Sequence, residues 1–153
     1  MNTIYLFMGL PFSGKSTLAR TWNTAHIEVD EVRKTLTGTY KIVEGSSAFI
    51  ADVVYQSARL YLERKEDVIV EGMFLTQSSR FLFIELAKSL NASIELHWFD
   101  PGFSWIQDKV EHYNSIKPHI SMGYVYAINK RLEFPDIDEG FNDFFYYNEK
   151  DFS

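Results

Sequence analysis

The sequence predicts an α/β fold in which a central parallel sheet of about five strands lies between two layers of helices, giving three layers. Three observations predict it: short apolar runs rich in β-branched and aromatic residues recur along the chain, helical stretches separate them, and a glycine-rich turn follows the first run. The chain has 153 residues, 46% of them hydrophobic, which suffices for one core. We therefore expect a single domain over 1–153.

The first half of the chain is expected to hold three strands and three helices. Strands are expected over 3–8, 26–30 and 67–72, and helices over 15–23, 30–38 and 46–66. We expect Asp30 to be the N-cap of the helix over 30–38 and Gly38 to end it. The helix over 46–66 is amphipathic, with apolar residues that we expect to face the core at Phe49, Val53, Val54, Ala58, Tyr61 and Leu62.

The second half repeats the alternation. A helix is expected over 77–90, a strand over 93–99 and a last strand over 144–148. Between them, 103–132 contains two helical pieces broken by the sequence SIKPH. We expect this segment to form a helical lid.

Composition limits the classes of function. The net charge is −6, and an acidic protein is on average repelled by nucleic acid, which argues against a broad polynucleotide-binding face. Residues 1–41 nevertheless carry five basic against three acidic side chains, so a local basic site for a short phosphorylated ligand remains possible. The chain has no cysteine, no long apolar run and no signal-peptide pattern, so we expect a cytoplasmic protein that does not enter a membrane.

The sequence GLPFSGKST, residues 9–17, carries the clearest chemistry. It fits the pattern GxxxxGK[ST] and lies between an expected strand and an expected helix, the context that this phosphate-binding loop, the P-loop, requires. Main-chain N–H groups and the positive end of the helix favour phosphates, the lysine adds charge at the β- and γ-phosphates, and the serine hydroxyl suits Mg²⁺. The pattern predicts a P-loop NTPase fold that binds ATP and Mg²⁺ through Gly9, Phe12, Ser13, Gly14, Lys15, Ser16 and Thr17.

Asp30 and Arg33 follow the second expected strand. Ligands of open parallel sheets bind outside the carboxyl ends of the strands, so Asp30 should lie near an acceptor hydroxyl and could take its proton. Arg33, one helical turn further on, has the planar fork that suits a phosphate of the acceptor. The alternative is that Asp30 only caps its helix and pairs with Arg33. With the glycine-rich loop beside it, we favour the catalytic interpretation for Lys15, Asp30 and Arg33.

These motifs give the sequence a family resemblance. GxPxSGKST followed by D-x-x-R resembles the kinase domain of the phage-type polynucleotide 5′-kinases and related AAA-type P-loop kinases, and 68–80 and 131–148 are similar to later segments of that domain. The resemblance covers nearly the whole chain. It implies that Asp30 is the general base, that Arg33 binds the phosphate next to the 5′-hydroxyl, and that Arg80 contacts the substrate.

Two positions within the resemblance admit alternatives. Glu71 stands where the family usually has aspartate, and it could reach Mg²⁺ through a water or support the site as a hydrogen-bond partner. We favour Glu71 and Ser16 as metal-site residues. Arg80 could equally be a solvated helix residue.

The expected lid departs from the family pattern. Relatives place arginines there, whereas this chain has none between Arg80 and Arg131. Lysine supplies charge without a bidentate fork, and we take Lys109 as the nucleotide contact, with Lys117 and Lys130 as the remaining lysines. His112 and His119 flank an expected loop without cysteine or paired acidic ligands, so we expect no metal site there.

The sequence therefore predicts an ATP- and Mg²⁺-dependent kinase acting on the 5′-hydroxyl of a nucleic-acid end. A small-molecule, nucleoside or nucleotide kinase is the first alternative. A nucleotide-binding protein without transfer activity is the second. The oligomeric state is not predicted.

Overall fold

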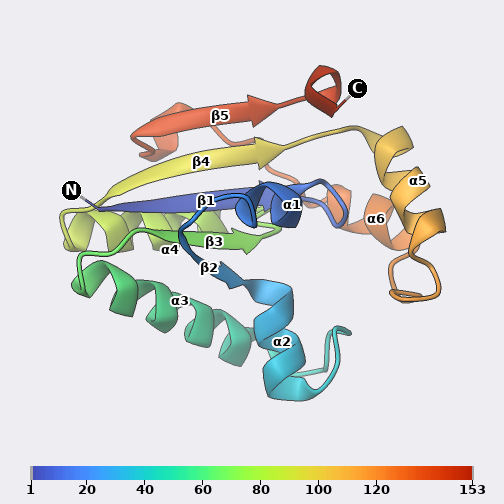
Figure 1. Ribbon diagram of the computed structural model, residues 1–153, viewed down its shortest axis with the longest axis horizontal. Coiled ribbons are helices and arrows are strands. Elements are labelled where there is room, and N and C mark those ends of the chain that lie inside the picture. The colour runs from blue at the N-terminus through green and yellow to red at the C-terminus, as the bar shows by residue number, and fades with distance from the viewer. Residues whose placement is uncertain (1, 153) are drawn as a thin grey trace.

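The computed structural model describes residues 2–152, and its centre is a five-stranded parallel sheet (Figure 1). The strands lie in the order β2-β3-β1-β4-β5. The predicted three-layer α/β fold is confirmed. The strand bounds are β1 (Thr3–Gly9), β2 (Ala25–Glu28), β3 (Val68–Gly72), β4 (Ser93–Phe99) and β5 (Asp143–Tyr147).

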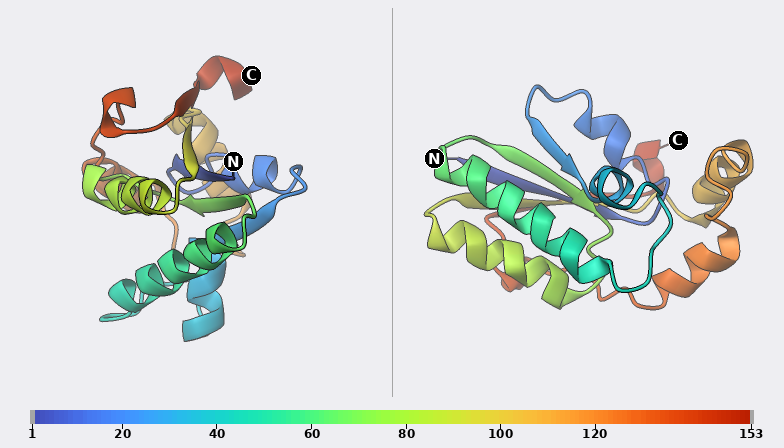
Figure 2. Two further views of the ribbon diagram at one scale, coloured as in Figure 1. Left: turned by 90° about the vertical axis from the view of Figure 1, so that its left-hand side faces the viewer. Right: turned by 90° about the horizontal axis from the view of Figure 1, so that it is seen from below.

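The helices lie on both faces of the sheet and beyond its carboxyl edge. In Figure 2, α3 and α4 run side by side along one face, and in Figure 1, α5 and α6 lie beyond the arrowheads of the strands. The helix bounds are α1 (Lys15–Ala19), α2 (Val29–Thr37), α3 (Ser47–Glu63), α4 (Gln77–Ser89), α5 (Phe103–His112) and α6 (Met122–Asn129), and the short 3₁₀ helices are η1 (Ile137–Glu139) and η2 (Glu149–Phe152). None of the helices within 2–152 has the length and apolar character needed to cross a membrane.

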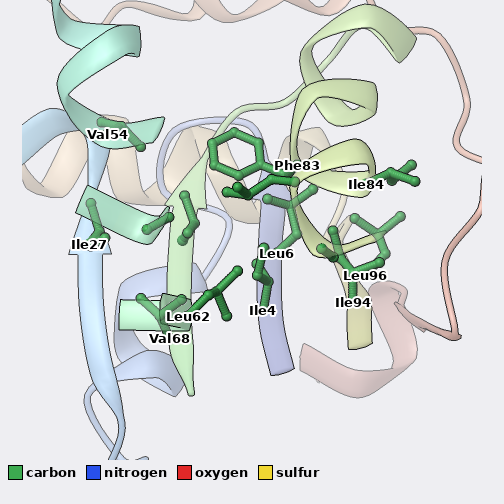
Figure 3. Packing of buried hydrophobic residues seen from close by; sticks show 14 of the residues in the cluster. Ile4, Leu6, Ile27, Val54, Leu62, Val68, Phe83, Ile84, Ile94 and Leu96 are labelled. Atoms are coloured by element: carbon green, nitrogen blue, oxygen red, sulfur yellow. The ribbon is translucent and has the colours of Figure 1, made fainter. Parts of the chain in front are cut away.

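The central strand β1 shows why the sheet is covered on both sides. Its residues alternate between faces, so that Ile4 and Leu6 pack into the large core under α3 and α4 while Phe7 packs with Ala19 of α1 on the other face. Figure 3 shows Ile4 and Leu6 among the buried side chains of α3, α4 and the neighbouring strands. Burial on both faces explains the continuous apolar run in the sequence.

Several expected boundaries are wrong by a few residues. β2 ends at Glu28 and α2 begins at Val29, so Asp30 lies in the first turn of α2 and does not cap it. α1 has five residues and ends well before residue 23. Gly38, in contrast, ends α2 with a left-handed φ of 81°, as predicted.

The buried face of α3 also differs from the expected one. Its buried residues follow a strict four-residue spacing, Ile50, Val54, Ala58 and Leu62, whereas Phe49 is 57% exposed. The amphipathic spacing places Phe49 on the apolar face of the helix, whereas in the structure the next residue, Ile50, is the one that enters the core.

Candidate active site

The glycine-rich loop joins β1 to α1 at the carboxyl edge of the sheet. Gly14 has a left-handed φ of 97°, and a Cβ added there would lie 2.9 Å from Cε1 of Phe152, so both conformation and space require glycine. The first N–H groups of α1 have no carbonyl partner within the helix. α1 has only five residues, so the groups that it offers to an anion are these N–H groups and the Lys15 side chain.

Lys15 is held against the loop that it follows. Its Nζ donates to the carbonyl oxygens of Gly9 at 2.6 Å and Leu10 at 2.9 Å. Burial lowers the pKa of Lys15, while the nearby carboxylates of Glu71 and Asp30 act in the opposite direction. The ammonium group therefore lies at the phosphate-binding loop with carboxylates on its other side.

Ser16 connects the loop to a group of acidic side chains. Its hydroxyl lies 2.6 Å from Oε1 of Glu71 and 3.0 Å from Oε1 of Glu28, and the other oxygen of Glu71 lies 3.0 Å from Nε2 of His26. Burial raises the pKa of Glu28, and the negative charge of Glu71 adds to this. Burial would also raise the pKa of Glu71, but hydrogen bonds from His26 and Ser16 and the charge of Lys15 outweigh it, so the net pKa is lowered. The pKa values of these two neighbouring carboxyl groups therefore shift in opposite directions.

Sequence reasoning missed Glu28 and His26. They are two residues apart on β2, so their side chains share one face, and Glu28 is directly opposite Glu71 in the parallel register. The alternation along the second expected strand could have indicated the shared face. What it could not give is the pairing of β2 with β3, which brings Glu71 to the same place.

Asp30 and Arg33 form an ion pair on α2. Nη1 of Arg33 donates to Oδ1 of Asp30 at 2.6 Å, with 51% of the Asp30 side chain exposed and 12% of the Arg33 side chain. Nε of Arg33 is buried and has no hydrogen-bond partner among the described residues. Both side chains line the same cavity as the glycine-rich loop, with a volume of about 500 Å³. The carboxylate and the phosphate loop therefore face one space.

The segment 103–132 forms the opposite wall of this cavity. Lys117 connects this segment to two other walls of the cavity. Its Nζ lies 5.1 Å from the ring centroid of Tyr40 and 5.8 Å from that of Phe12. Phe12 in turn stacks on Tyr113, with ring centroids 5.6 Å apart. The other residues of this segment that line the cavity are Trp105, Lys109, Ile116, His119, Ile120 and Tyr124.

The predicted site residues are mostly brought together. Those that line the cavity are Phe12, Ser13, Gly14, Lys15, Ser16, Asp30, Arg33, Glu71 and Lys109. Gly9 contributes its carbonyl oxygen to Lys15, whereas Thr17 is exposed outside the cavity. The ammonium group of Lys109 lies 4.8 Å from the ring centroid of Trp105.

Arg80 lies elsewhere, and neither the substrate contact nor the solvated position expected for it agrees with the structure. Its side chain is completely buried and forms an ion pair with Glu139, with Nε to Oε1 at 2.9 Å. Nη1 and Nη2 donate to the carbonyl oxygens of Phe74 and Glu133. The guanidinium fixes the segment 131–139 to the end of β3, which the local sequence could not reveal because Glu139 is 59 residues away.

A loop of this sequence and geometry after the first strand of a parallel sheet defines a P-loop nucleotide-binding protein. A family model described as an AAA domain matches residues 4–114, and the chain belongs to this family. This confirms the resemblance to AAA-type P-loop proteins found in the sequence. No curated protein sequence matches the chain.

Solved structures of kinases and related proteins share the fold. A chain of the Pnkp1/Rnl/Hen1 RNA repair complex matches 86% of this chain with a TM-score of 0.73 at 19% identity, and this chain spans only 44% of its length. Kti12 from Chaetomium thermophilum, solved with ADP-AlF3, matches with a TM-score of 0.68 at 14% identity, covering 95% of this chain and 88% of that one. A gluconokinase from Sinorhizobium meliloti 1021 matches with a TM-score of 0.60 at 18% identity, covering 96% and 82%. At these identities the likeness shows the fold.

Proposed function

We propose that this protein transfers the γ-phosphoryl group of ATP to a hydroxyl, and that the acceptor is the 5′-hydroxyl of an oligonucleotide or polynucleotide end. The observation that carries the proposal is the position of Asp30, whose carboxylate lines the same cavity as Lys15 and the glycine-rich loop. A carboxylate beside a phosphate-binding loop can orient an alcohol toward the terminal phosphorus.

The reaction uses groups that the cavity already holds. The acceptor oxygen bonds to the γ-phosphorus, the bond from that phosphorus to the β–γ bridging oxygen breaks, and ADP leaves with the electron pair. The proton of the hydroxyl passes to the carboxylate of Asp30. Lys15 stabilises the charge that accumulates on the phosphate oxygens.

The residues around Ser16 fit a divalent cation. The Ser16 hydroxyl and a Glu71 oxygen are 2.6 Å apart and face the same cavity, and hard cations such as Mg²⁺ prefer such oxygen ligands. In our proposal Ser16 and Glu71 hold Mg²⁺ with the nucleotide phosphates. The ion supplies charge neutralisation when bound.

The acceptor side of the cavity supports a phosphorylated substrate. Arg33, Lys41 and Lys117 all line it, so the cavity of a chain of net charge −6 contains three basic side chains. Tyr40 adds an aromatic surface next to them, which suits a base. The similarity of the fold to a chain of an RNA repair complex is consistent with this acceptor. We also propose that 103–132 acts as a lid over these groups.

A small-molecule acceptor is the second candidate. A cavity of about 500 Å³ has the size of a small-ligand site, and a gluconokinase shares the fold. A sugar or nucleoside would use Asp30 in the same way but would have less use for the positive groups around it.

An acceptor panel with labelled ATP tests the proposal. The panel contains a 5′-hydroxyl oligonucleotide, a nucleoside 3′-monophosphate, free nucleosides and sugars. We expect label on the first two, and label on sugars or free nucleosides alone would favour the second candidate. ATP binding without transfer to any acceptor would support a binding protein and contradict the proposal.

Variants of α2 identify the catalytic groups in the same assay. Asp30→Asn removes the proton acceptor and should lower the rate of transfer at least about 100-fold, the usual contribution of a general base. Asp52→Asn, an exposed change on α3, is the matched control. Arg33→Ala should weaken acceptors that carry a phosphate much more than free nucleosides, and equal losses would contradict the phosphate contact.

A further inference from the structure

The acidic group next to the glycine-rich loop includes the imidazole nitrogen of His26, a type of ligand that Mg²⁺ does not require because it prefers oxygen. His26, Glu28 and Glu71 each place a ligand atom within 4.8 Å of the others, and Ser16 adds its hydroxyl. No other set of three histidine, cysteine or acidic residues within 2–152 approaches in this way. His26 belongs to the site by position, yet phosphate transfer as described above gives it no task.

Two of the distances within this group match the edges of a coordination octahedron, and the third, from the Ser16 hydroxyl to Oε1 of Glu71, is shorter at 2.6 Å. Neighbouring ligands of an octahedral ion with bonds of about 2.1 Å are about 3.0 Å apart. Nε2 of His26 is 3.0 Å from Oε2 of Glu71, and the hydroxyl of Ser16 is 3.0 Å from Oε1 of Glu28. The four side chains can therefore surround one ion after small adjustments.

The neighbouring carboxylates of Glu28 and Glu71 also favour the binding of a cation. Glu28 and Glu71 are directly opposite in the register of β2 and β3, where like charges destabilise the pairing of strands. Arg20 reaches Glu28 only at 3.8 Å and is largely exposed, so it compensates little.

An ion can reach the group from solvent. Ser16, Glu28 and Glu71 line the cavity that holds Asp30, while His26 and Glu28 line a second cavity between β2, α2 and α3. Glu28 therefore separates two open spaces. The group is accessible although Glu71 itself is only 2% exposed.

We propose that His26, Glu28, Glu71 and Ser16 form a binding site for a first-row transition-metal dication, with Nε2 of His26 as a direct ligand. Imidazole favours such ions over Mg²⁺, which binds oxygen almost exclusively. This inference rests on the proposed function in one respect, since the ion would occupy the place there given to Mg²⁺. The nitrogen ligand makes a first-row transition-metal ion bind more tightly than Mg²⁺ does, and Mn²⁺ serves below as the probe of this class.

The simpler role for His26 is to orient Glu71 through the 3.0 Å hydrogen bond. His26→Gln separates the two roles. A glutamine amide can donate to the Glu71 carboxylate as a neutral imidazole does, but it does not supply an imidazole nitrogen to a metal. His112→Gln, at an exposed position on α5, is the matched control.

The test is Mn²⁺ binding to the nucleotide-free protein, followed by electron paramagnetic resonance. Free Mn²⁺ is titrated with wild type, His26→Gln and His112→Gln, and pulsed spectra of the bound ion are examined for coupling to ¹⁴N. We expect ¹⁴N coupling in wild type and in His112→Gln. In His26→Gln we expect loss of the coupling and at least about tenfold weaker Mn²⁺ binding, with a much smaller change in Mg²⁺ affinity measured by competition.

Three results would overturn the metal site: no Mn²⁺ binding without nucleotide, bound Mn²⁺ without ¹⁴N coupling in wild type, or His26→Gln that binds Mn²⁺ as wild type does. The wild-type spectrum decides the question even if the variant fails to fold. Phosphate transfer with Mg²⁺ is measured on the same wild-type preparation. Mn²⁺ binding through nitrogen without phosphorylation of any acceptor would support the metal site and contradict the proposed function. Phosphorylation of an acceptor without Mn²⁺ binding through nitrogen would support the proposed function and contradict the metal site.

Discussion

The ion pair between Arg80 and Glu139 offers the sharpest test of the fold that supports the site. Their side chains are 0% and 6% exposed, and the pair is joined by bonds of 2.9 and 3.1 Å. Glu139→Gln keeps the shape but leaves the buried guanidinium without its counter-charge. Breaking a buried pair from one side costs about 3–5 kcal/mol. In a chain of this size each kcal/mol lowers Tm by about 2–4 °C, so we expect a decrease of about 6–20 °C.

Calorimetry and urea unfolding measure this effect. The matched control is Glu63→Gln, which removes the carboxylate from the exposed pair with Arg59 and should leave Tm unchanged. Glu139→Gln, assayed well below its Tm, should keep the wild-type rate of phosphate transfer, because Arg80 lies outside the cavity. Equal Tm values for the two variants would refute the structural role of Arg80. A loss of acceptor binding in folded Glu139→Gln would contradict the placement of this ion pair outside the acceptor site.

Three further predictions concern single residues. Lys15→Met should abolish ATP turnover and the increase of Tm that ATP gives the wild type. The Tm of the nucleotide-free protein should not decrease, because burial already disfavours the charged form of Lys15. ATP turnover by this variant would contradict the P-loop assignment. Burial lowers the pKa of His97 from 6.5 to about 4, so the folded state binds fewer protons than the unfolded state. Between pH 7 and pH 5 the free energy of unfolding of the wild type should therefore fall by about 2 kcal/mol more than that of His97→Phe. Equal pH dependence of the two proteins would contradict the lowered pKa. Gly14→Ala should lose ATP binding because its Cβ meets the side chain of Phe152. Gly38 has a similar positive φ but open space around it, so Gly38→Ala should lower the stability of the protein without affecting ATP binding. ATP binding by both variants would argue against the contact between residue 14 and Phe152.

The sequence was a good guide to features that depend on local patterns. The apolar runs located all five strands, and the spacing of Gly9, Gly14 and Lys15 identified the phosphate-binding loop. The motif also placed Asp30 and Arg33 at the carboxyl edge of the sheet, where the structure has them. Each of these follows from neighbours within a few residues in the chain.

Features that depend on distant partners were missed. Arg80 carries no local sign that Glu139 and two carbonyl oxygens surround it. His26 and Glu28 become part of the site only because β2 pairs with β3, which brings Glu71 opposite them. Strand pairing and contacts between distant segments are properties of the whole fold, so they could not be predicted from the local patterns of a single sequence.

The central claim is that the glycine-rich loop holds the triphosphate while Asp30 aims the acceptor hydroxyl at it. A crystal structure with a non-hydrolysable ATP analogue and a short 5′-hydroxyl oligonucleotide tests this most directly. We predict phosphate density within hydrogen-bond distance of the main-chain N–H groups of 13–17, with the 5′-oxygen between Asp30 and the γ-phosphorus. Triphosphate density away from this loop, or an acceptor hydroxyl out of reach of the Asp30 carboxylate, would contradict the account.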